Sequence, residues 1–220
     1  MNKCLLCNNA IQFNPKFCDL LFLQTDSSPL CSECRKQFET IETPFCSRCQ
    51  KGGVEKICQD CLEWERKGEV VHHRAIYHYN KAMKEYFRNY KFWKDYRLRE
   101  CFREELSKRL KEYKDFTIIV IPISEERQKE RGFNQVSSLL DAANIDYLDI
   151  LKKREVEKQS HLSRQDRMQR SNVFYCEESS LPDRILLFDD IYTTGTTLHQ
   201  AKETLLKIES KEIKTFSLCR

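Results

Sequence analysis

Four pairs of cysteines, each with two residues between its members, occur within the first 61 residues. This spacing places both sulfurs on one side of a tight turn, close enough to share one tetrahedral ion. Eight thiolates are enough for two closed Cys4 sites of the structural kind that zinc occupies. A redox dithiol array is the alternative, but four such pairs in succession favour zinc. The predicted ligands are Cys4, Cys7, Cys31, Cys34, Cys46, Cys49, Cys58 and Cys61.

The order in which the cysteine pairs combine stays open in the sequence. A sequential arrangement joins the first two pairs around one ion and the last two pairs around another. A crossed arrangement would combine the same four pairs in a different order. Nine of the twelve cysteines lie in the first 61 residues, and Cys18 is left without a partner pair. Because we expect a cytoplasmic chain, this clustering indicates metal binding rather than disulfides.

Two adjacent acids near the end of the chain form a second group of residues that could bind a ligand or take part in catalysis. Asp189 and Asp190 follow the apolar run 185–188 and precede a segment rich in threonine. Ligands of open α/β sheets bind at the carboxyl ends of strands, where paired carboxylates suit a hydroxyl-rich or cationic ligand. A strand, turn and helix with threonine caps and no ligand is the alternative. Phosphate groups bind where the amides of a helix N-terminus, hydroxyl donors and a glycine occur together. The sequence therefore predicts a phosphate-binding site formed by Thr193, Thr194, Gly195, Thr196 and Thr197.

Basic and aromatic side chains are interleaved over residues 84–114, which hold eleven Lys or Arg against six Asp or Glu. Basic side chains bind phosphates, and aromatic rings stack on unpaired bases. The alternative is a pair of amphipathic helices whose aromatics form core and whose lysines face solvent. Lys91, Lys94 and Arg97 are the candidate contacts to nucleic acid.

Alternating strand and helix patterns must position these groups, and they predict an α/β fold with an open, mainly parallel sheet. The segment 154–172 is polar and shows neither pattern, and a loop of that length is usually functional. The expected strands are 70–79, 117–121, 147–151, 185–190 and 213–218, and the expected helices are 81–93, 97–113, one opened by Gly132, and 196–208.

The length of 220 residues fits one domain of about 150 residues and a small module. We therefore divide the chain into a double zinc ribbon, 1–66, and a second domain, 67–220. The formal charge of +4 becomes zero when eight thiolates (−8) hold two zinc ions (+4). No apolar run reaches the ~18 residues of a membrane span, and none follows the N-terminus, so we expect no signal peptide and no membrane insertion.

The acids and the threonine-rich loop resemble the fingerprint of the type I phosphoribosyltransferases. The resemblance implies their fold and a site for 5-phosphoribosyl 1-pyrophosphate (PRPP) with Mg²⁺. Asp189 and Asp190 would be the catalytic acids at the ribose hydroxyls, and residues 193–197 would hold the 5-phosphate. No group that would recognise an acceptor base is apparent, so whether such a site is active stays open.

Further motifs are similar to those of the ComF family, which includes the GntX-type proteins and in which a double zinc ribbon precedes a phosphoribosyltransferase domain. The segment from Pro122 to Ser124, with Arg127 and Arg131, resembles its pyrophosphate-binding region. Residues 159–173 resemble its flexible loop, where Arg164 and Arg167 are candidate contacts to the leaving group. The alternative is that each of these arginines is a solvent-exposed charge on a polar loop and contacts no ligand.

The same resemblance implies a late competence protein that acts in natural transformation, the uptake of single-stranded DNA into the cytoplasm. Its implied partners are single-stranded DNA and a ComFA-like helicase ATPase, and an association with the membrane-bound uptake machinery stays open. The competing hypothesis is an active phosphoribosyltransferase that uses PRPP and Mg²⁺ with an unidentified acceptor. At residue 94, lysine replaces a glycine that is usual in this family, which puts the local turn in doubt.

Overall fold

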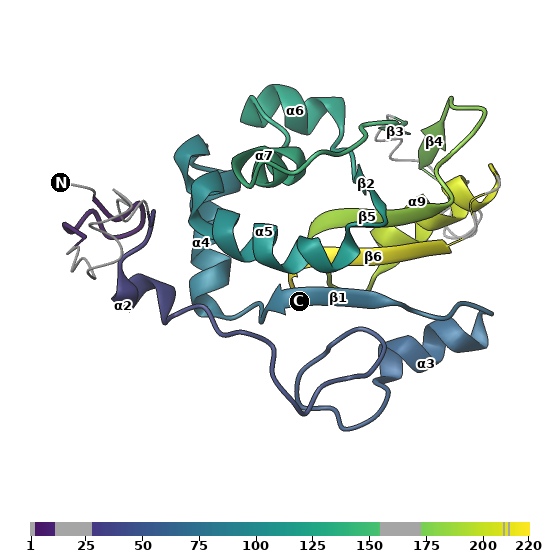
Figure 1. The fold of residues 1–220 in the computed structure, drawn as a ribbon, viewed down its shortest axis with the longest axis horizontal. Coiled ribbons are helices and arrows are strands. Elements are labelled where there is room, and N and C mark those ends of the chain that lie inside the picture. Colours follow the sequence, from purple (N-terminus) through teal and green to yellow (C-terminus); the bar gives the residue numbers. More distant parts are fainter. Residues whose placement is uncertain (1–2, 12–27, 155–172, 209, 211) are drawn as a thin grey trace, which may run out of the picture.

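A computed structural model describes residues 3–11, 28–154, 173–208, 210 and 212–220. Its centre is a parallel four-stranded sheet with the strand order β1-β6-β5-β2 (Figure 1). A separate antiparallel pair is formed by β3 and β4. The α/β class and the mainly parallel sheet are thereby confirmed. The strands are β1 (His73–Tyr77), β2 (Thr117–Val120), β3 (Leu151–Lys153), β4 (Phe174–Cys176), β5 (Arg184–Ile191) and β6 (Glu212–Cys219).

Helices lie on both faces of the sheet, with α5 and α7 on the near face and α9 behind it in Figure 1. No helix within the described ranges is both long and apolar enough to cross a membrane. The helices are α2 (Ser32–Arg35), α3 (Gln59–Arg66), α4 (Lys81–Lys91), α5 (Arg103–Leu110), α6 (Glu125–Arg131), α7 (Gln135–Ala142) and α9 (Thr196–Leu206).

The two faces of β5 explain why its apolar run is uninterrupted. Side chains alternate across a strand, so a strand covered on both faces buries every residue. Leu186 and Phe188 belong to the core shared with α7, whereas Ile185 and Leu187 belong to the core shared with α9. The burial of this run fixes the acids that follow it at the carboxyl edge of the sheet.

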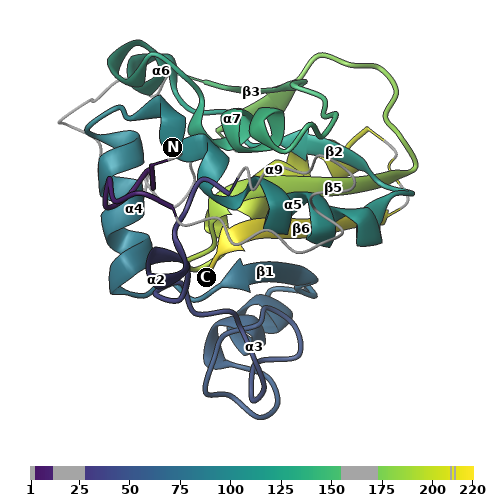
Figure 2. The same cartoon turned by 60° about the vertical axis from the view of Figure 1, so that its left-hand side comes forward.

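Residues 41–48 cover the outer edge of the sheet, which is the side of β1 that does not pair with β6. Ile41 N–H donates to the Ile76 carbonyl (3.0 Å), and His73 N–H donates to the Arg48 carbonyl (2.9 Å). The α3 helix lies beneath β1 in Figure 1, whereas α2 lies beside α4 in both views (Figures 1 and 2). The N-terminal segment therefore packs on the sheet domain at two separate places.

Gly132 ends a helix rather than beginning one. The α6 helix, which has no apolar periodicity and was not predicted, closes at Gly132 in a left-handed conformation (φ 81°). The next helix, α7, begins at Gln135, and the Asn134 side chain accepts the Val136 N–H at its N-terminus. The prediction failed because Gly is favoured one residue beyond a helix C-terminus.

Other predicted boundaries also change. The expected helix 97–113 is divided into a 3₁₀ helix, Tyr96–Phe102, then α5, then a 3₁₀ turn, Lys111–Tyr113. The expected strand 147–151 is reduced to one parallel bridge between Leu148 and Ile119, and β3 begins only at Leu151. The polar segment 155–172, with Arg164 and Arg167, lies outside the described residues.

Lys94 occupies a left-handed backbone conformation, with φ at 58°. Lys94 therefore adopts a backbone conformation that glycine favours. A residue with a Cβ atom is destabilised in this conformation by about 1 kcal/mol, because the Cβ approaches the following carbonyl oxygen.

We predict that Lys94→Gly raises the free energy of unfolding by ~1 kcal/mol, as measured by urea titration. Asn144→Gly is the matched control, because Asn144 has a similar φ of 52° but asparagine tolerates this region better. Its gain should be smaller. An unchanged or lowered free energy of unfolding for Lys94→Gly would show that strain at Lys94 is absent.

Candidate functional site

The two acids lie at the carboxyl end of β5 and differ in their surroundings. Asp190 is buried, whereas Asp189 is partly exposed and accepts the Asp190 N–H with its Oδ1 (2.8 Å). Asp190 forms an ion pair with Lys91 from the last turn of α4, with 2.7 Å between Oδ2 and Nζ. Both side chains in this pair are largely buried, at 8% and 13% exposed.

The environment drives the pKa values of the two carboxyls in opposite directions. Burial raises the pKa of Asp190, but Lys91, Gln135 and Arg131 outweigh this effect and lower it below its ordinary value. Burial and the negative charge of Asp190 raise the pKa of Asp189. Asp190 is therefore the anion of the pair, and Asp189 retains a proton more readily than an ordinary aspartate.

The threonine-rich loop after β5 is open to solvent on its threonine side. Thr193, Thr194, Thr196 and Thr197 are exposed, and α9 begins without a side-chain cap on its first N–H groups. Gly195 is buried with φ at 84°, and a Cβ there would lie 2.3 Å from the Tyr192 hydroxyl. Only glycine fits this position, so the loop presents uncapped amide and hydroxyl donors of the kind that bind phosphate.

The three residues predicted to contact pyrophosphate occupy α6 and its N-terminus. The Ser124 hydroxyl accepts the Arg127 N–H (3.4 Å) as the N-cap of α6. Arg127 is exposed, whereas Arg131 is buried and donates to the Gln135 side-chain carbonyl (2.6 Å). Burial lowers the pKa of Arg131. Arg127 and Arg131 line one cleft together, which places their charges on a common surface.

This cleft has a volume of about 790 Å³ and lies between α4, α6 and the end of β5. Six of its lining residues are basic and one, Glu85, is acidic. Aromatic surface is also present, since Phe92 is 66% exposed. We call this cavity the basic cleft; it is lined by Tyr79, Lys81, Lys84, Glu85, Phe87, Arg88, Lys91, Phe92, Arg127, Arg131 and Ile191.

The sequence identified only one of the four basic residues that α4 contributes to the basic cleft. Lys91 lies in the cleft wall, but its charge is engaged by Asp190. Lys94 and Arg97 are exposed outside the cleft, and Arg97 binds Asp95. Helical spacing is the signal that could have found the others, because Lys81, Lys84, Arg88 and Lys91 recur at i, i+3, i+7 and i+10 on one face.

Lys153 is another basic residue that sequence reasoning missed. It lies at the end of β3, within electrostatic range of Asp189 and Arg127. Burial lowers its pKa, and the positive charge of Arg127 acts in the same direction. No periodic pattern marks this position, because β3 has only three residues.

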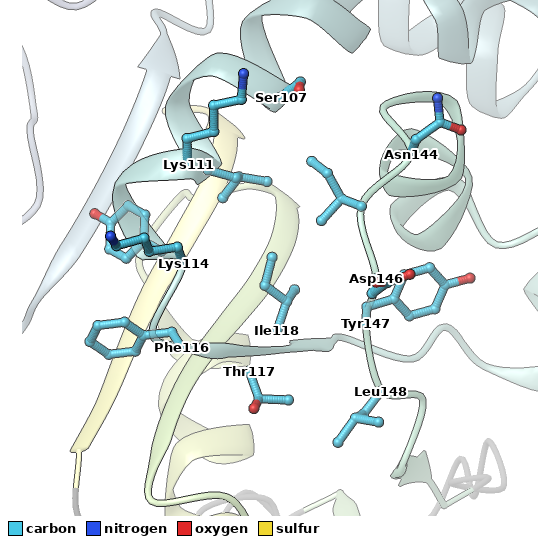
Figure 3. A pocket seen from close by; sticks show the side chains of 13 residues that line it. Ser107, Lys111, Lys114, Phe116, Thr117, Ile118, Asn144, Asp146, Tyr147 and Leu148 are labelled. Atoms are coloured by element: carbon cyan, nitrogen blue, oxygen red, sulfur yellow. The ribbon is translucent and has the colours of Figure 1, made fainter.

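A second hollow, of about 490 Å³, lies at the other end of the sheet (Figure 3). It is lined by Thr117, the first residue of β2, and by residues of α5 and the segment 144–148. Ligands of parallel sheets bind at the carboxyl ends of the strands. The position of this hollow at an amino end therefore favours the basic cleft and the threonine-rich loop as the functional site.

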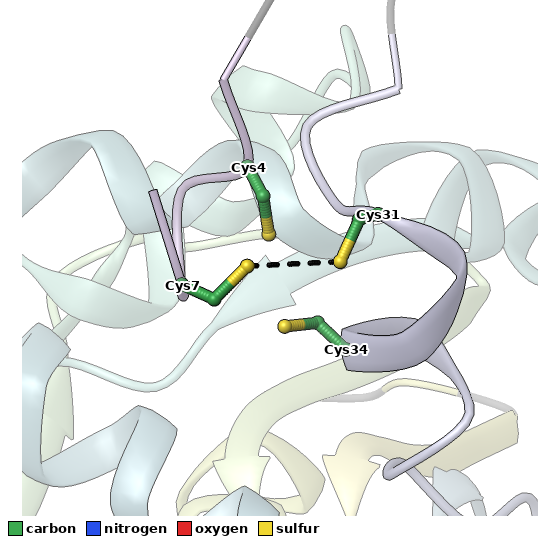
Figure 4. Close-up of side chains that lie close together, drawn as sticks. All are labelled: Cys4, Cys7, Cys31 and Cys34. Atoms are coloured by element: carbon green, nitrogen blue, oxygen red, sulfur yellow. Dashed lines mark hydrogen bonds between the residues drawn. The ribbon is translucent and has the colours of Figure 1, made fainter. Parts of the chain in front are cut away.

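The eight predicted cysteine ligands form two groups in sequential order. Within each group, all four sulfurs lie within 4.8 Å of one another. The first group comprises Cys4, Cys7, Cys31 and Cys34, with 3.7 Å between the sulfurs of Cys7 and Cys31 (Figure 4). The second comprises Cys46, Cys49, Cys58 and Cys61 and is wholly buried.

These distances fit zinc, because four Zn–S bonds of ~2.3 Å in a tetrahedron place sulfurs about 3.8 Å apart. In the second group the sulfur of Cys46 also accepts the Cys58 N–H (3.3 Å). Burial raises the pKa of Cys46, but backbone N–H groups of Cys58, Cys49 and Arg48 outweigh it and lower the pKa to about 6. Such donors stabilise one thiolate, whereas burial raises the pKa of Cys49 and of Cys61, so the positive charge of a bound zinc ion would be required to ionise all four.

Comparisons with known proteins identify similar chains, although no family model matches. The chain is 44% identical to Competence protein ComFC of Streptococcus pneumoniae over 219 residues, which cover 99% of this chain and all of the relative. It is 32% identical to Competence protein ComFC of Bacillus subtilis, over 99% of this chain and 94% of the relative. Competence protein F of Haemophilus influenzae is 29% identical over 87% of this chain and 90% of the relative.

We predict that Asp189→Asn stabilises the protein increasingly from pH 4 to pH 8. The raised pKa means that native Asp189 keeps a proton that the unfolded chain releases, so it lowers stability as pH rises through this interval. Asparagine removes the penalty. Urea titrations at several pH values measure the difference between variant and wild type. A difference that is constant with pH would contradict the assignment.

Proposed function

Because the chain belongs to the ComF family of competence proteins, we propose that it binds single-stranded DNA during natural transformation, while the strand enters the cytoplasm. The basic cleft is the observation that carries this proposal. Six of its lining residues are basic and one is acidic, and with Lys91 paired to Asp190 an excess of positive charge remains for a phosphate backbone.

The amphipathic character of α4 determines which of its basic side chains face the cleft. Its apolar face, which includes Met83, Tyr86 and Tyr90, is buried in the core. Lys84 and Arg88 are consequently held on the opposite side, toward the cleft. The end of α4 adds exposed aromatic surface, because Phe92 and Trp93 are 66% and 77% exposed. Exposed aromatic rings beside a basic groove are typical of sequence-tolerant binding to unpaired bases.

We place a ribose-phosphate ligand such as PRPP beside the basic cleft. Asp189 and Asp190 would bind the ribose hydroxyls, and the loop 193–197 would bind the 5-phosphate. Ser124, Arg127 and Arg131 would face the pyrophosphate. Mg²⁺ would neutralise charge on the pyrophosphate when it is bound with PRPP. Lys91 and Arg131 support this placement, because both line the cleft and both act on Asp190.

The two cysteine groups would hold zinc as structural ions, since four thiolates leave no open position for chemistry. A ComFA-like ATPase is the proposed protein partner, and the zinc-bound segments, which lie on the outside of the sheet domain in Figure 1, would supply a docking surface for it. This association would place the chain at the membrane-associated uptake machinery.

A second candidate function is phosphoribosyl transfer to an unidentified acceptor. It is favoured by the opposed pKa shifts of Asp189 and Asp190, because such separation is typical of acid–base sites. If this activity exists, Asp190→Asn should abolish magnesium-dependent release of pyrophosphate from PRPP. Failure of the wild-type, zinc-loaded protein to release pyrophosphate with any of a panel of nucleobases and amines would exclude them as acceptors.

We predict that the double variant Lys84→Glu/Arg88→Glu binds a labelled oligothymidylate at least tenfold more weakly than wild type at 50 mM salt. It should also show a shallower dependence of affinity on salt, because fewer counterions are released per strand bound. Fluorescence anisotropy measures both quantities.

Lys108→Glu/Lys111→Glu is the matched control, because it makes the same change of charge on α5 and the turn after it, away from the basic cleft. It should retain most of the affinity. If both double variants lose the same affinity for the oligothymidylate, binding depends on net charge, and the proposal that the basic cleft binds the strand is wrong.

A further inference from the structure

We propose that Trp64 and Arg220 are positioning residues for the threonine-rich loop, and that zinc in the second cysteine group acts through them on affinity for a phosphate ligand. This inference rests on the proposed function in one respect, namely that residues 193–197 bind phosphate. It assigns a ligand-binding consequence to a metal site that otherwise stabilises only the fold.

Trp64 links the second cysteine group directly to the loop. Its Nε1–H donates to the Thr194 carbonyl oxygen (2.9 Å), and its indole stacks on His199 of α9 at 3.7 Å between ring centres. Trp64 stands three residues after Cys61 on α3, whose N-cap is Cys58. The position of the indole is therefore tied to that of two cysteine ligands.

Arg220 provides a second link, beside the first. Its Nη1 donates to the Thr193 carbonyl oxygen (3.2 Å), and its guanidinium lies over the Tyr192 ring at 4.5 Å. The same side chain, 5% exposed, lies 3.5 Å from a carboxylate oxygen of Asp60. Asp60 stands between Cys58 and Cys61 in the first turn of α3, so this arginine joins α3 to the loop.

These two bonds determine where the loop amides point. In a planar trans peptide the C=O and N–H groups point in opposite directions. Since the carbonyls of Thr193 and Thr194 accept from Arg220 and Trp64, the N–H group of each following residue points away from the side chain that binds its own peptide. Among the described residues neither N–H donates to a backbone carbonyl. Successive backbone N–H groups in a turn of this kind can form an anion-binding concavity.

The second cysteine group is packed into the same core as the loop, whereas the first is not. Cys46, Cys49, Cys58 and Cys61 share a buried cluster with Tyr192 and Leu198. Cys4 and Cys34 belong instead to the core on the other face, with Phe38 and Tyr86. Loss of zinc from the second group should release α3 and with it the N–H donors of Trp64 and Arg220 to the loop carbonyls, while loss of zinc from the first group should leave these donors in place.

Calorimetric titration of the zinc-loaded full chain with PRPP and Mg²⁺ tests the proposal. Trp64→Phe keeps an aromatic ring on His199 but removes the N–H donor. We expect an increase in Kd of about tenfold with unchanged zinc content and at most a small fall in melting temperature; a merely structural role would lower the melting temperature and leave Kd unchanged. Tyr147→Phe is the control, because it also removes one side-chain donor, the Tyr147 hydroxyl that bonds Asp141 (2.9 Å), but at the amino end of the sheet, and its Kd should equal that of wild type.

The zinc dependence is tested by comparing Cys7→Ser with Cys49→Ser, with bound zinc counted per chain. Cys7→Ser should lose zinc and keep PRPP affinity, whereas Cys49→Ser should lose both. If Trp64→Phe binds PRPP as tightly as wild type, the inference is wrong while the phosphate site stands. If the wild-type protein binds no PRPP, the proposed ribose-phosphate site fails and the inference fails with it.

Discussion

The buried ion pair between Lys91 and Asp190 is the interaction on which the site depends. Its atoms are 2.7 Å apart, and both side chains are largely removed from solvent. Removing one partner of such a pair leaves an uncompensated buried charge, at a cost of about 3–5 kcal/mol. The pair therefore holds the end of α4 against the end of β5. With α4 fixed in this way, its apolar face enters the core and its basic face borders the cleft.

The same ion pair separates the two acids chemically. Lys91 keeps Asp190 ionised, and that negative charge, together with burial, raises the pKa of Asp189. The carboxyl end of the sheet consequently offers one fixed anion, one carboxyl that holds its proton more readily, and basic side chains nearby. A ligand that carries hydroxyls and phosphates matches both parts of this arrangement. The threonine-rich loop adjoins this arrangement, and its carbonyls accept hydrogen bonds from Trp64 of α3 and from Arg220, which follows β6.

Sequence patterns predicted the elements that have strong periodicity or tight local spacing. The buried run of β5, the helix at 81–91 and the eight cysteine ligands were all accessible in this way, whereas the sequential pairing of the cysteines came from the structure. Elements held by capping alone were not: α6 has no apolar stripe, and Gly132 was assigned to the wrong helix end. Contacts between distant segments were also inaccessible, since Trp64 and Thr194 are 130 residues apart. Lys91 shows the same limit, because its charge suggested a solvent-facing contact until the fold placed it beside Asp190.

The central claim is that the basic cleft and the threonine-rich loop form one anion-binding site at the carboxyl end of the sheet, joined at Lys91 and Asp190. A crystal structure of the zinc-loaded protein with PRPP and Mg²⁺ tests it most directly. The account predicts ribose density against Asp189 and Asp190, the 5-phosphate at the amides of 194–197, and pyrophosphate toward Arg127 and Arg131. Ligand density in the hollow lined by Thr117 and residues 144–148, with none at the two acids, would contradict it.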